Sequence, residues 1–481
     1  MTATHDEILI NPGDVMLDKI EIESITGELF DISGIMIELN IYEDIFSNGI
    51  TGDVAVIDAV NLFNVVPIIG QEVIRIKFKT PVIDPDPMRE LTFHIYKASR
   101  RTFKNDNTQA YVLHFASPGT IKNALTKIHR TIGINPEDQN STGQISDMVN
   151  EIVARDLAHE EEIPQLETIV PTQGTYQFVI PYWSPYKTIN WLAKRAVPTS
   201  GGNDNSGNPA DKNYVFFETI NPRTEESESG LVYNFLPIGF LYGQKSRHEN
   251  TFFFGPVPRA AASTGKLATN IKDMYYTITS YEVLDSMDTL SAIRSGMFAS
   301  KLISYDMNTK KITTKEYDYI KEFENEASSP TVVYGKHDTR NPLTIAGTNA
   351  GGFKFHKEPD SFIQRYDTHS QYHDAGLDMN PQEWVLERQS AMAQMKMQRI
   401  RCEVPGNSYL RAGDVFEVFI PLMGEKPAGP EQDKYMSGKY IITSLRHMVQ
   451  KSGYFSTMEL AKNAFYNQLP EAKDTEPNSP K

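Results

Sequence analysis

The fold is decided by two short stretches, EVIRIKF at residues 72–78 and DVFEVFI at residues 414–420. Each opens with an acidic residue, Glu72 or Asp414, and then places an apolar side chain at every second position. Such a period of two is typical of a β-strand with one face in the core and the other toward solvent. We expect the buried faces to consist of Ile74, Ile76, Phe78, Phe416, Val418 and Ile420.

The residues that follow the two stretches correspond as well. Each stretch is followed by a loop with three prolines, a strand (91–96 or 440–445), a basic connector and a final strand that opens with tyrosine. The distance from the acid to that tyrosine is 39 residues for Tyr111 and 40 residues for Tyr454. This agreement predicts an internal repeat, and chance similarity between two β-hairpins is the alternative. The basic connectors contain Arg100-Arg101 and Arg446-His447.

The repeat is expected to extend upstream of the first stretch. Residues 35–41 alternate, and a turn at Asn48-Gly49 leads to a second strand that ends at Asp58. In the second copy, residues 275–283 and the turn at Ser295-Gly296 would match them. The apolar face of the first of these strands is predicted to hold Ile35, Ile37, Leu39 and Ile41, and the strand after the second turn is predicted to end at Asp306.

A repeat of this kind gives a mainly β fold with α/β insertions. We expect two similar small antiparallel β-barrel (tube) domains plus two accessory domains. One accessory domain can interrupt the second barrel, because an insertion at a loop tip costs little closure entropy. The expected divisions are a first tube β-barrel at 1–118, an α+β accessory domain at 119–271, a second, split tube β-barrel at 272–308 and 396–466, an inserted accessory domain at 309–395 and a flexible tail at 467–481.

The accessory segments carry helical patterns. Residues 121–131, 145–159 and 382–399 have helical spacing, and Ser184-Pro185 is a helix start with serine as N-cap and proline at the first helical position. The buried stripe of that helix is predicted to hold Ile189, Leu192, Ala193 and Ala196, followed by a strand at 214–219.

Composition excludes several functions. A formal net charge of −15 argues against nucleic-acid binding as the main role, because binding to phosphates needs clustered Lys and Arg. No apolar run is long enough to span a membrane, and the first residues lack the pattern of a signal peptide. The single cysteine, Cys402, fits a chain that folds in a reducing compartment.

Five motifs are distinctive: PYWSPY at 181–186, WLAKRA at 191–196, YVFFET at 214–219, SGMF at 295–298 and RAGDV at 411–415. In these motifs the chain resembles the baseplate hub protein of contractile-tailed, T-even-type bacteriophages. The resemblance covers residues 30–465, and the loops at 200–208 and 221–230 and the C-terminal tail depart from it.

The resemblance implies a homotrimeric structural protein of the virion tail baseplate that assembles in the host cytoplasm. Its partners would be the trimeric central spike protein and the hexameric tail tube ring, with tape-measure and baseplate wedge proteins as further candidates. It would act as a symmetry adaptor around a channel through which DNA passes as cargo, without inserting into a membrane.

No residue is predicted to be catalytic, to bind a cofactor or to ligate a metal. His369 and His373 lie four residues apart beside two aspartates, but Gly376 favours a loop over a metal-binding helix. Gly265-Lys266 lacks the flanking residues of a phosphate-binding loop. Cys402 lies in an alternating strand and is expected to be a small buried residue rather than a nucleophile.

Two other functions stay open at this point. The first is the hub or tube-initiator ring of a related contractile injection system, which keeps the fold and changes the partners. The second belongs to a different class: residues 119–230 or 309–395 would form a cell-wall hydrolase domain carried on the tail. Activity on purified peptidoglycan would distinguish this second reading.

Overall fold

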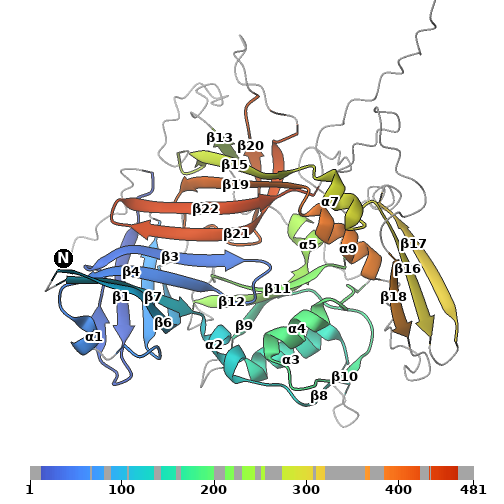
Figure 1. Cartoon of the computed structure of the whole chain (residues 1–481), viewed down its shortest axis with the longest axis horizontal. Coiled ribbons are helices and arrows are strands. Elements are labelled where there is room, and N and C mark those ends of the chain that lie inside the picture. Colours follow the sequence, from blue (N-terminus) through green and yellow to red (C-terminus); the bar gives the residue numbers. More distant parts are fainter. Residues whose placement is uncertain are drawn as a thin grey trace, which may run out of the picture.

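The protein was analysed as a computed structural model. It describes residues 12–65, 68–80, 88–105, 108–134, 142–158, 164–199, 212–220, 230–243, 251–254, 274–306, 310–319, 363–368, 384–422, 433 and 435–463. The fold is mainly β, as expected, with a few short helices (Figure 1). The predicted loop at 200–208, all but the last residue of the predicted loop at 221–230, the tail at 467–481 and most of the inserted segment lie outside the described residues.

The first repeat predicted from the sequence is a set of five antiparallel strands, which we call the first unit. Its members are β3 (Met36–Asp44), β4 (Thr51–Asp58), β5 (Val73–Lys79), β6 (Arg89–Asn105) and β7 (Thr108–Ala116). Their pairing order is β3-β4-β7-β6-β5.

The second unit has the same pairing order. Its members are β15 (Ser280–Ser286), β19 (Gln398–Pro405), β20 (Val415–Phe419), β21 (Gly438–Gln450) and β22 (Gly453–Ala461). They pair, again antiparallel, in the order β15-β19-β22-β21-β20. Each strand of the first unit therefore has a counterpart in the second.

The correspondence extends to a β-bulge. The register of β6 against β7 shifts between Ile95 and Lys97, and that of β21 against β22 shifts between Ile442 and Ser444. Both shifts come two residues after the strand starts to pair with its hairpin partner, at His94–Ala116 and Ile441–Ala461. Chance similarity between hairpins does not explain an extra residue at the same step of the ladder.

Glu72 and Asp414 also occupy the same place. The Glu72 carboxylate accepts the backbone N–H groups of Ile69 and Gly70, and that of Asp414 accepts the N–H of Arg411, so each acid closes the turn before its strand. Their carbonyl groups accept N–H groups of the next strand, from Ile95 at 2.8 Å and Ile442 at 2.9 Å.

The two units are joined edge to edge. Strand β3 pairs antiparallel with β21, with Tyr42 opposite Arg446. The path β15-β19-β22-β21-β3-β4-β7-β6 is therefore continuous, and we call it the shared sheet (Figure 1). The sheet also includes β1 (Met16–Glu23) and β2 (Leu29–Asp31) beyond β5, and β13 (Phe252–Phe254) and β14 (Thr277–Ile278) beyond β20. Among the described strands no pairing closes either unit into a barrel, so the expected β-barrels are not confirmed.

One predicted strand belongs elsewhere. β16 (Ala299–Asp306), which follows Ser295-Gly296, forms a separate sheet with β17 (Ile312–Asp318) and β18 (Ile363–Thr368). The prediction that this strand pairs with residues 275–283 is wrong, because β19 takes that position. Leu302 of β16 instead packs in a small core with residues of α7 (Thr289–Arg294) and α9 (Val385–Gln394).

Three finer predictions also need correction. Ile37 is 39% exposed and Met36 is buried, because a bulge between Met36 and Glu38 reverses the alternation of β3. Tyr454 was predicted to match Tyr111. The strand registers match Ala461 to Ala116, so Tyr454 corresponds to Gln109, which lies two residues before Tyr111. The basic pairs predicted as connectors, Arg100-Arg101 and Arg446-His447, lie within β6 and β21.

The α+β segment packs beside the first unit. Its elements are α2 (Pro118–Leu125), β8 (Thr131–Gly133), α3 (Ile145–Asp156), β9 (Gln165–Ile169), β10 (Gln177–Val179), α4 (Pro185–Ala193), β11 (Tyr214–Ile220), β12 (Leu231–Pro237) and α5 (Ile238–Gly243). The start of α4 at Ser184-Pro185 and its buried stripe are confirmed. The helices predicted at 121–131 and 382–399 are shorter, because Thr126 turns extended and β19 begins at Gln398.

Separate hydrophobic cores hold these parts. Ile74 and Ile76 lie in the core of the first unit, and Phe416, Val418 and Ile420 lie in that of the second. All of these, with Phe78, are buried as predicted. A further core joins the α+β segment to both units, and its members include Ile45, Phe217, Leu236, Leu241, Tyr242, Val415 and Ile441.

Candidate assembly interface

One face of the shared sheet is polar across both units. Because the side chains of paired strands alternate in step, residues opposite one another in register share a face. The members of this polar face include Glu38, Asn40, Tyr42, Asp53, Glu282, Asp285, Arg399, Arg401, Ser444, Arg446, Gln450 and Glu459. The opposite face is the one that buries Leu39, Ile41, Val54, Cys402, Met458 and Leu460.

Side-chain contacts cross the joint between the units. Arg446 on β21 donates from Nε to Asn40 Oδ1 (2.9 Å), and its Nη2 lies 3.0 Å from Glu38 Oε1. Ser444 donates to Asp44 Oδ2 (2.8 Å). The hydrogen bond from Asn40, with help from Arg446, lowers the pKa of Glu38. The cation thus comes from the second unit and the carboxylate from the first.

Ion pairs continue over the second unit. Arg401 lies 2.8 Å from Glu459 and 3.4 Å from Glu282, and Arg399 pairs with Asp285. Half-exposed pairs of this kind contribute only about 0–1 kcal/mol each. We therefore read the polar face as a solvated surface whose charges are mutually neutralised, and not as a source of stability.

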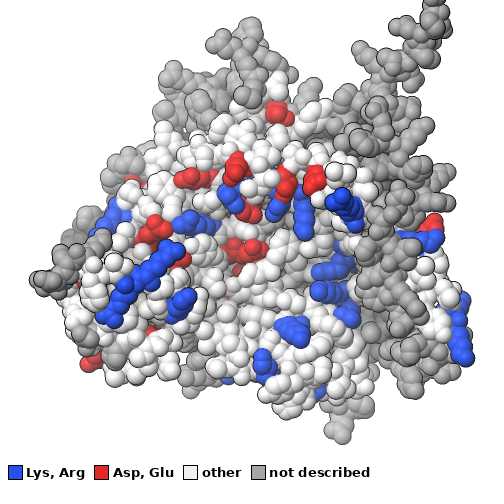
Figure 2. Space-filling view, viewed as in Figure 1, with Lys and Arg blue, Asp and Glu red and all other residues white. Residues whose placement is uncertain are grey.

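Charge is mixed over the strands of the second unit. Figure 2 shows Lys and Arg interspersed with Asp and Glu over β19, β21 and β22, without a single basic patch. Such a face has no cluster of cations that could hold phosphates tightly.

The buried side of the joint holds a polar group of its own. Glu43 and His447 are fully buried, with Glu43 Oε1 3.6 Å from His447 Nε2. Glu43 Oε2 accepts the N–H of Ala412 (3.1 Å), and His447 Nδ1 shares a 2.6 Å hydrogen bond with the hydroxyl of Tyr454. Glu43 Oε1 and His447 Nε2 themselves have no hydrogen-bond partner among the described residues. Because buried polar groups are costly without partners, we expect the joint between β3 and β21 to be sensitive to changes in this group.

The hairpin turn between β3 and β4 docks on the α+β segment. Asn48 Nδ2 donates to the carbonyl of Phe216 (2.8 Å), and the N–H of Ile50 donates to Glu218 Oε2 (2.9 Å). A Cβ on Gly49 would lie 2.0 Å from Thr120 Oγ1, so only glycine fits there. Burial raises the pKa of Glu218 to about 7.

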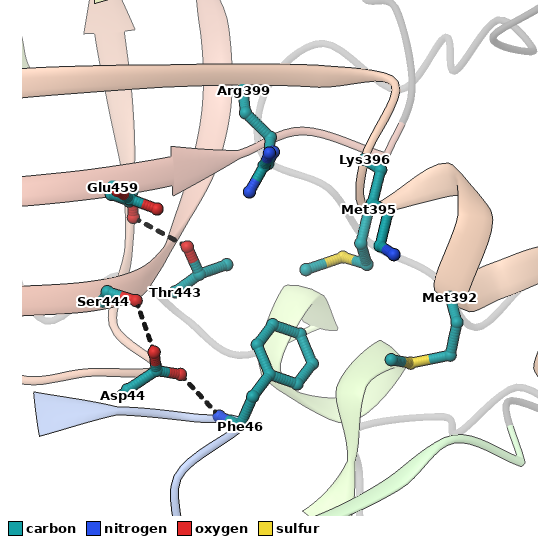
Figure 3. A pocket seen from close by; sticks show the side chains of 9 residues that line it. All are labelled: Asp44, Phe46, Met392, Met395, Lys396, Arg399, Thr443, Ser444 and Glu459. Carbon is teal, nitrogen blue, oxygen red and sulfur yellow. Dashed lines mark hydrogen bonds between the residues drawn. The ribbon is translucent and has the colours of Figure 1, made fainter. Parts of the chain in front are cut away.

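A pocket opens where the shared sheet meets α9, with a volume of about 220 Å³. Figure 3 shows Phe46, Met392 and Met395 on its apolar side, while Lys396, Arg399 and Glu459 give it charged walls. The same view shows Asp44, which accepts from Ser444 and from the N–H of Phe46.

The residues weighed as sites from the sequence are not brought together. Cys402 is buried on β19, and burial raises its pKa to about 12, which fits the predicted small core residue. His369, His373 and Gly265-Lys266 lie outside the described residues. Within the described ranges, no group of His, Cys, Asp and Glu side chains could hold a metal ion. No helix there is long and apolar enough to cross a membrane.

Sequence reasoning missed Glu43, His447 and Glu218. The only signal for Glu218 was its place inside the apolar run 214–220, where a strand buried on both faces leaves no solvent for a carboxylate. Glu43 and His447 carry no local signal, because their burial arises from the pairing of distant strands.

Comparison with known proteins gives one sequence relative and structural matches with TM-scores below 0.5. No family model matches the chain. A stretch of 206 residues is 23% identical to the probable baseplate hub protein gp334 of Vibrio phage KVP40, covering 40% of this chain and 43% of that protein. The match thus spans less than half of the relative.

Two solved structures match most of the chain with TM-scores below 0.5. The 43 kDa tail protein of prophage MuSo2 from Shewanella oneidensis is 9% identical, with a TM-score of 0.48 over 92% of this chain and 98% of that one. A tail protein from Neisseria meningitidis MC58 is also 9% identical, with a TM-score of 0.49 over 92% and 96%. On the sequence match, the resemblance to baseplate hub proteins that the motifs indicated is confirmed.

Proposed function

We propose that the protein is the structural hub of a contractile phage tail baseplate, a trimeric adaptor between the six-fold tail tube and the three-fold central spike. The observation that carries this proposal is the internal repeat. Two units with one strand order and one bulge position in each chain give six similar units when three chains form a ring. Such a ring is six-fold toward the tube and three-fold toward the spike.

The sequence relative supports the location. The matched protein of Vibrio phage KVP40 is named a probable baseplate hub protein, and this supports a place in the virion tail baseplate for this chain. Tube, spike, tape-measure and wedge proteins are then its proposed partners.

The polar face supports a role in lining the DNA channel. Its arginines are paired with carboxylates, as Arg446 is with Glu38 and Arg401 is with Glu459. A channel wall of this kind would not retain the phosphate backbone, since retention requires cations free to replace counterions. DNA is therefore proposed as passing cargo and not as a ligand.

We also propose that the chain catalyses no reaction. The thiol of Cys402 is buried with a raised pKa, and a thiol rather than a thiolate is a poor nucleophile. The hydrolase reading predicts activity on purified peptidoglycan, and we expect none.

Native mass spectrometry tests the assembly. The purified chain would be measured alone and mixed with the central spike protein of the same phage. We expect a complex with three copies of the chain, and a stable dimer or tetramer without any trimer would contradict the proposal. If three copies bind a tube protein but not the spike, the tube-initiator role would replace the hub role.

A further inference from the structure

The shared sheet ends in two strands that have only one described partner over most of their length. Beyond His94, where its pairing with β5 ends, β6 pairs only with β7 among the described strands. At the other end, β15 pairs only with β19. A sheet edge of this kind is a template for pairing with another strand.

The internal repeat identifies what each edge is suited to. β6 is the counterpart of β21, and β15 is the counterpart of β3, as the common pairing order shows. Within the chain, β21 uses the equivalent edge, beyond its pairing with β20, to bind β3. The equivalent of the contact between β3 and β21 would be a contact between β6 and β15, which the described strands of one chain do not form.

The twin contact requires two chains. In one chain β6 and β15 are the opposite ends of the shared sheet, separated by six strands of the path β19-β22-β21-β3-β4-β7 (Figure 1). We propose that β15 of one copy pairs antiparallel with β6 of the next and repeats the β3–β21 joint between chains. This proposal rests on the ring of copies proposed above and specifies how the ring is closed.

The internal joint fixes the register of the proposed contact. The strand pairings of the two units match Ser99 of β6 to Arg446 of β21, and Asp285 of β15 to Tyr42 of β3. Arg446 and Tyr42 lie opposite each other in the internal joint. Ser99 of one copy should therefore lie opposite Asp285 of the next. Leu445 and Glu43 are also opposite each other in the internal joint, and their matches in the proposed contact are Ala98 and Ser286. Further along, Val449 lies opposite Leu39, and their matches are Phe103 and Tyr281.

The two edges carry opposite charges, as the strands of the internal joint do, although at positions other than those that match Arg446 and Glu38. There, Arg446 on β21 meets Glu38 on β3. On the proposed contact β6 carries Lys97 and Arg100, and β15 carries Glu282 and Asp285. Opposite charges on the two edges favour β6 meeting β15 over either strand meeting its own copy.

Exposed apolar side chains mark the same edges. Phe103 is 71% exposed and Tyr96 is 49% exposed on β6, and Val283 is 43% exposed on β15. Pairing of the strands would remove part of this apolar surface from water, which favours association.

Disulfide cross-linking tests the register. The variant carries Ala98→Cys and Ser286→Cys in one chain, because residues directly opposite on paired strands lie within disulfide distance. The control carries Ala98→Cys and Ser280→Cys, which the predicted register puts several residues apart. The natural Cys402 is buried and serves as background in both. Each variant is oxidised alone and with the spike protein, and then analysed by denaturing electrophoresis and native mass spectrometry.

We expect the Ala98/Ser286 variant, and not the control, to give covalent dimers and trimers in most of the protein. A trimer by native mass spectrometry without this cross-link, or with equal cross-linking in the control, would overturn the proposed contact and leave the proposed function standing. The absence of any assembly of copies with the spike present would overturn both.

Discussion

The two units differ most in chain connection at the tip of the hairpin that starts each. In the first unit a short turn, residues 45–50, connects β3 to β4 and docks through Asn48 on the α+β segment. In the second unit the equivalent hairpin, β15 and β19, is opened by residues 287–397. Both units nevertheless keep one pairing order and one bulge position.

These units are therefore defined by how their strands pair, and not by whether the strands follow one another directly in the sequence. A hairpin tip is far from the ladder's interior, and lengthening its loop adds closure entropy only slowly. The same tip has therefore been used in two ways, as a docking point in one unit and as the origin of an inserted sheet in the other. If the units are equivalent, matched substitutions in them should have matched effects.

The largest effect is expected from charge burial at the matched core positions Ile74 and Phe416. Both face the core of their own unit, one residue after the first residue of the strand. Ile74→Asp and Phe416→Asp should each cost several kcal/mol, because the carboxylate would have no partner, against a domain stability of about 5–15 kcal/mol. We expect misfolded protein and no assembled tails from both, measured by circular dichroism and by electron microscopy of lysates. Normal folding of only one of the two variants would show that the two units are not equivalent.

A smaller effect is expected at the joint between the units. Glu43→Ala would leave the buried N–H of Ala412 without its acceptor, at a cost of about 1–3 kcal/mol. Glu38→Ala on the polar face of the same strand removes a half-exposed pair with Arg446 and part-buried hydrogen bonds from Asn40 and Gln450, whose donors can turn to water. It should cost less than about 1 kcal/mol. Urea unfolding of the two variants measures the difference. Equal losses would mean that the buried network does not determine how the units meet.

The docked tip of the first unit should respond to pH. The carboxyl of Glu218 has a pKa of about 7 in the folded chain against 4.5 ordinarily, so the folded state holds a proton that the unfolded state releases between these values. The free energy of unfolding should therefore fall as pH rises from about 4.5 to about 7, and remain level above.

The variant Glu218→Gln should remove this fall in the free energy of unfolding, because glutamine does not titrate. We expect it to be more stable than the natural chain by about 1–3 kcal/mol at pH 8, with a smaller or reversed difference at pH 5, since Gln can still accept from Ile50. Thermal unfolding at both pH values measures the effect. A difference that does not change with pH would show that Glu218 does not titrate in this range.

The smallest effects are expected on the solvent sides of β5 and β20. Arg75 and Glu417 occupy matched positions, opposite Thr92 and Lys439. Arg75→Ala removes half-exposed pairs with Glu23 and Glu90, and Glu417→Ala truncates an exposed side chain. Both should change stability by less than about 1 kcal/mol, so any defect should appear in assembly alone. Collapse of either variant would mean that the strand faces were assigned backwards.

Local patterns were sufficient to predict the strands of the units. The alternation around Ile74 and Phe416 indicated both β5 and β20 with the correct buried face, and the spacing of the acids indicated the repeat. The start of α4 was equally readable, because Ser184-Pro185 restricts the backbone locally.

Pairing between distant segments could not be read in the same way. Ser295-Gly296 is as good a turn as Asn48-Gly49, yet its following strand packs with α7 and α9, because the partner of β15 lies more than a hundred residues further on. The position of the tyrosines was misjudged by two residues for a similar reason. Matching residue types does not reveal the register, which the bulges set. β1 was missed although Ile20 and Ile22 alternate in it.

Cryo-electron microscopy of the assembled baseplate is the decisive test of the proposed ring. We expect three copies of the chain in one ring, with first and second units alternating around the channel and β15 of each copy paired with β6 of the next. A ring in which the two units of a chain lie at different radii or levels, or in which the chain number is not three, would contradict it.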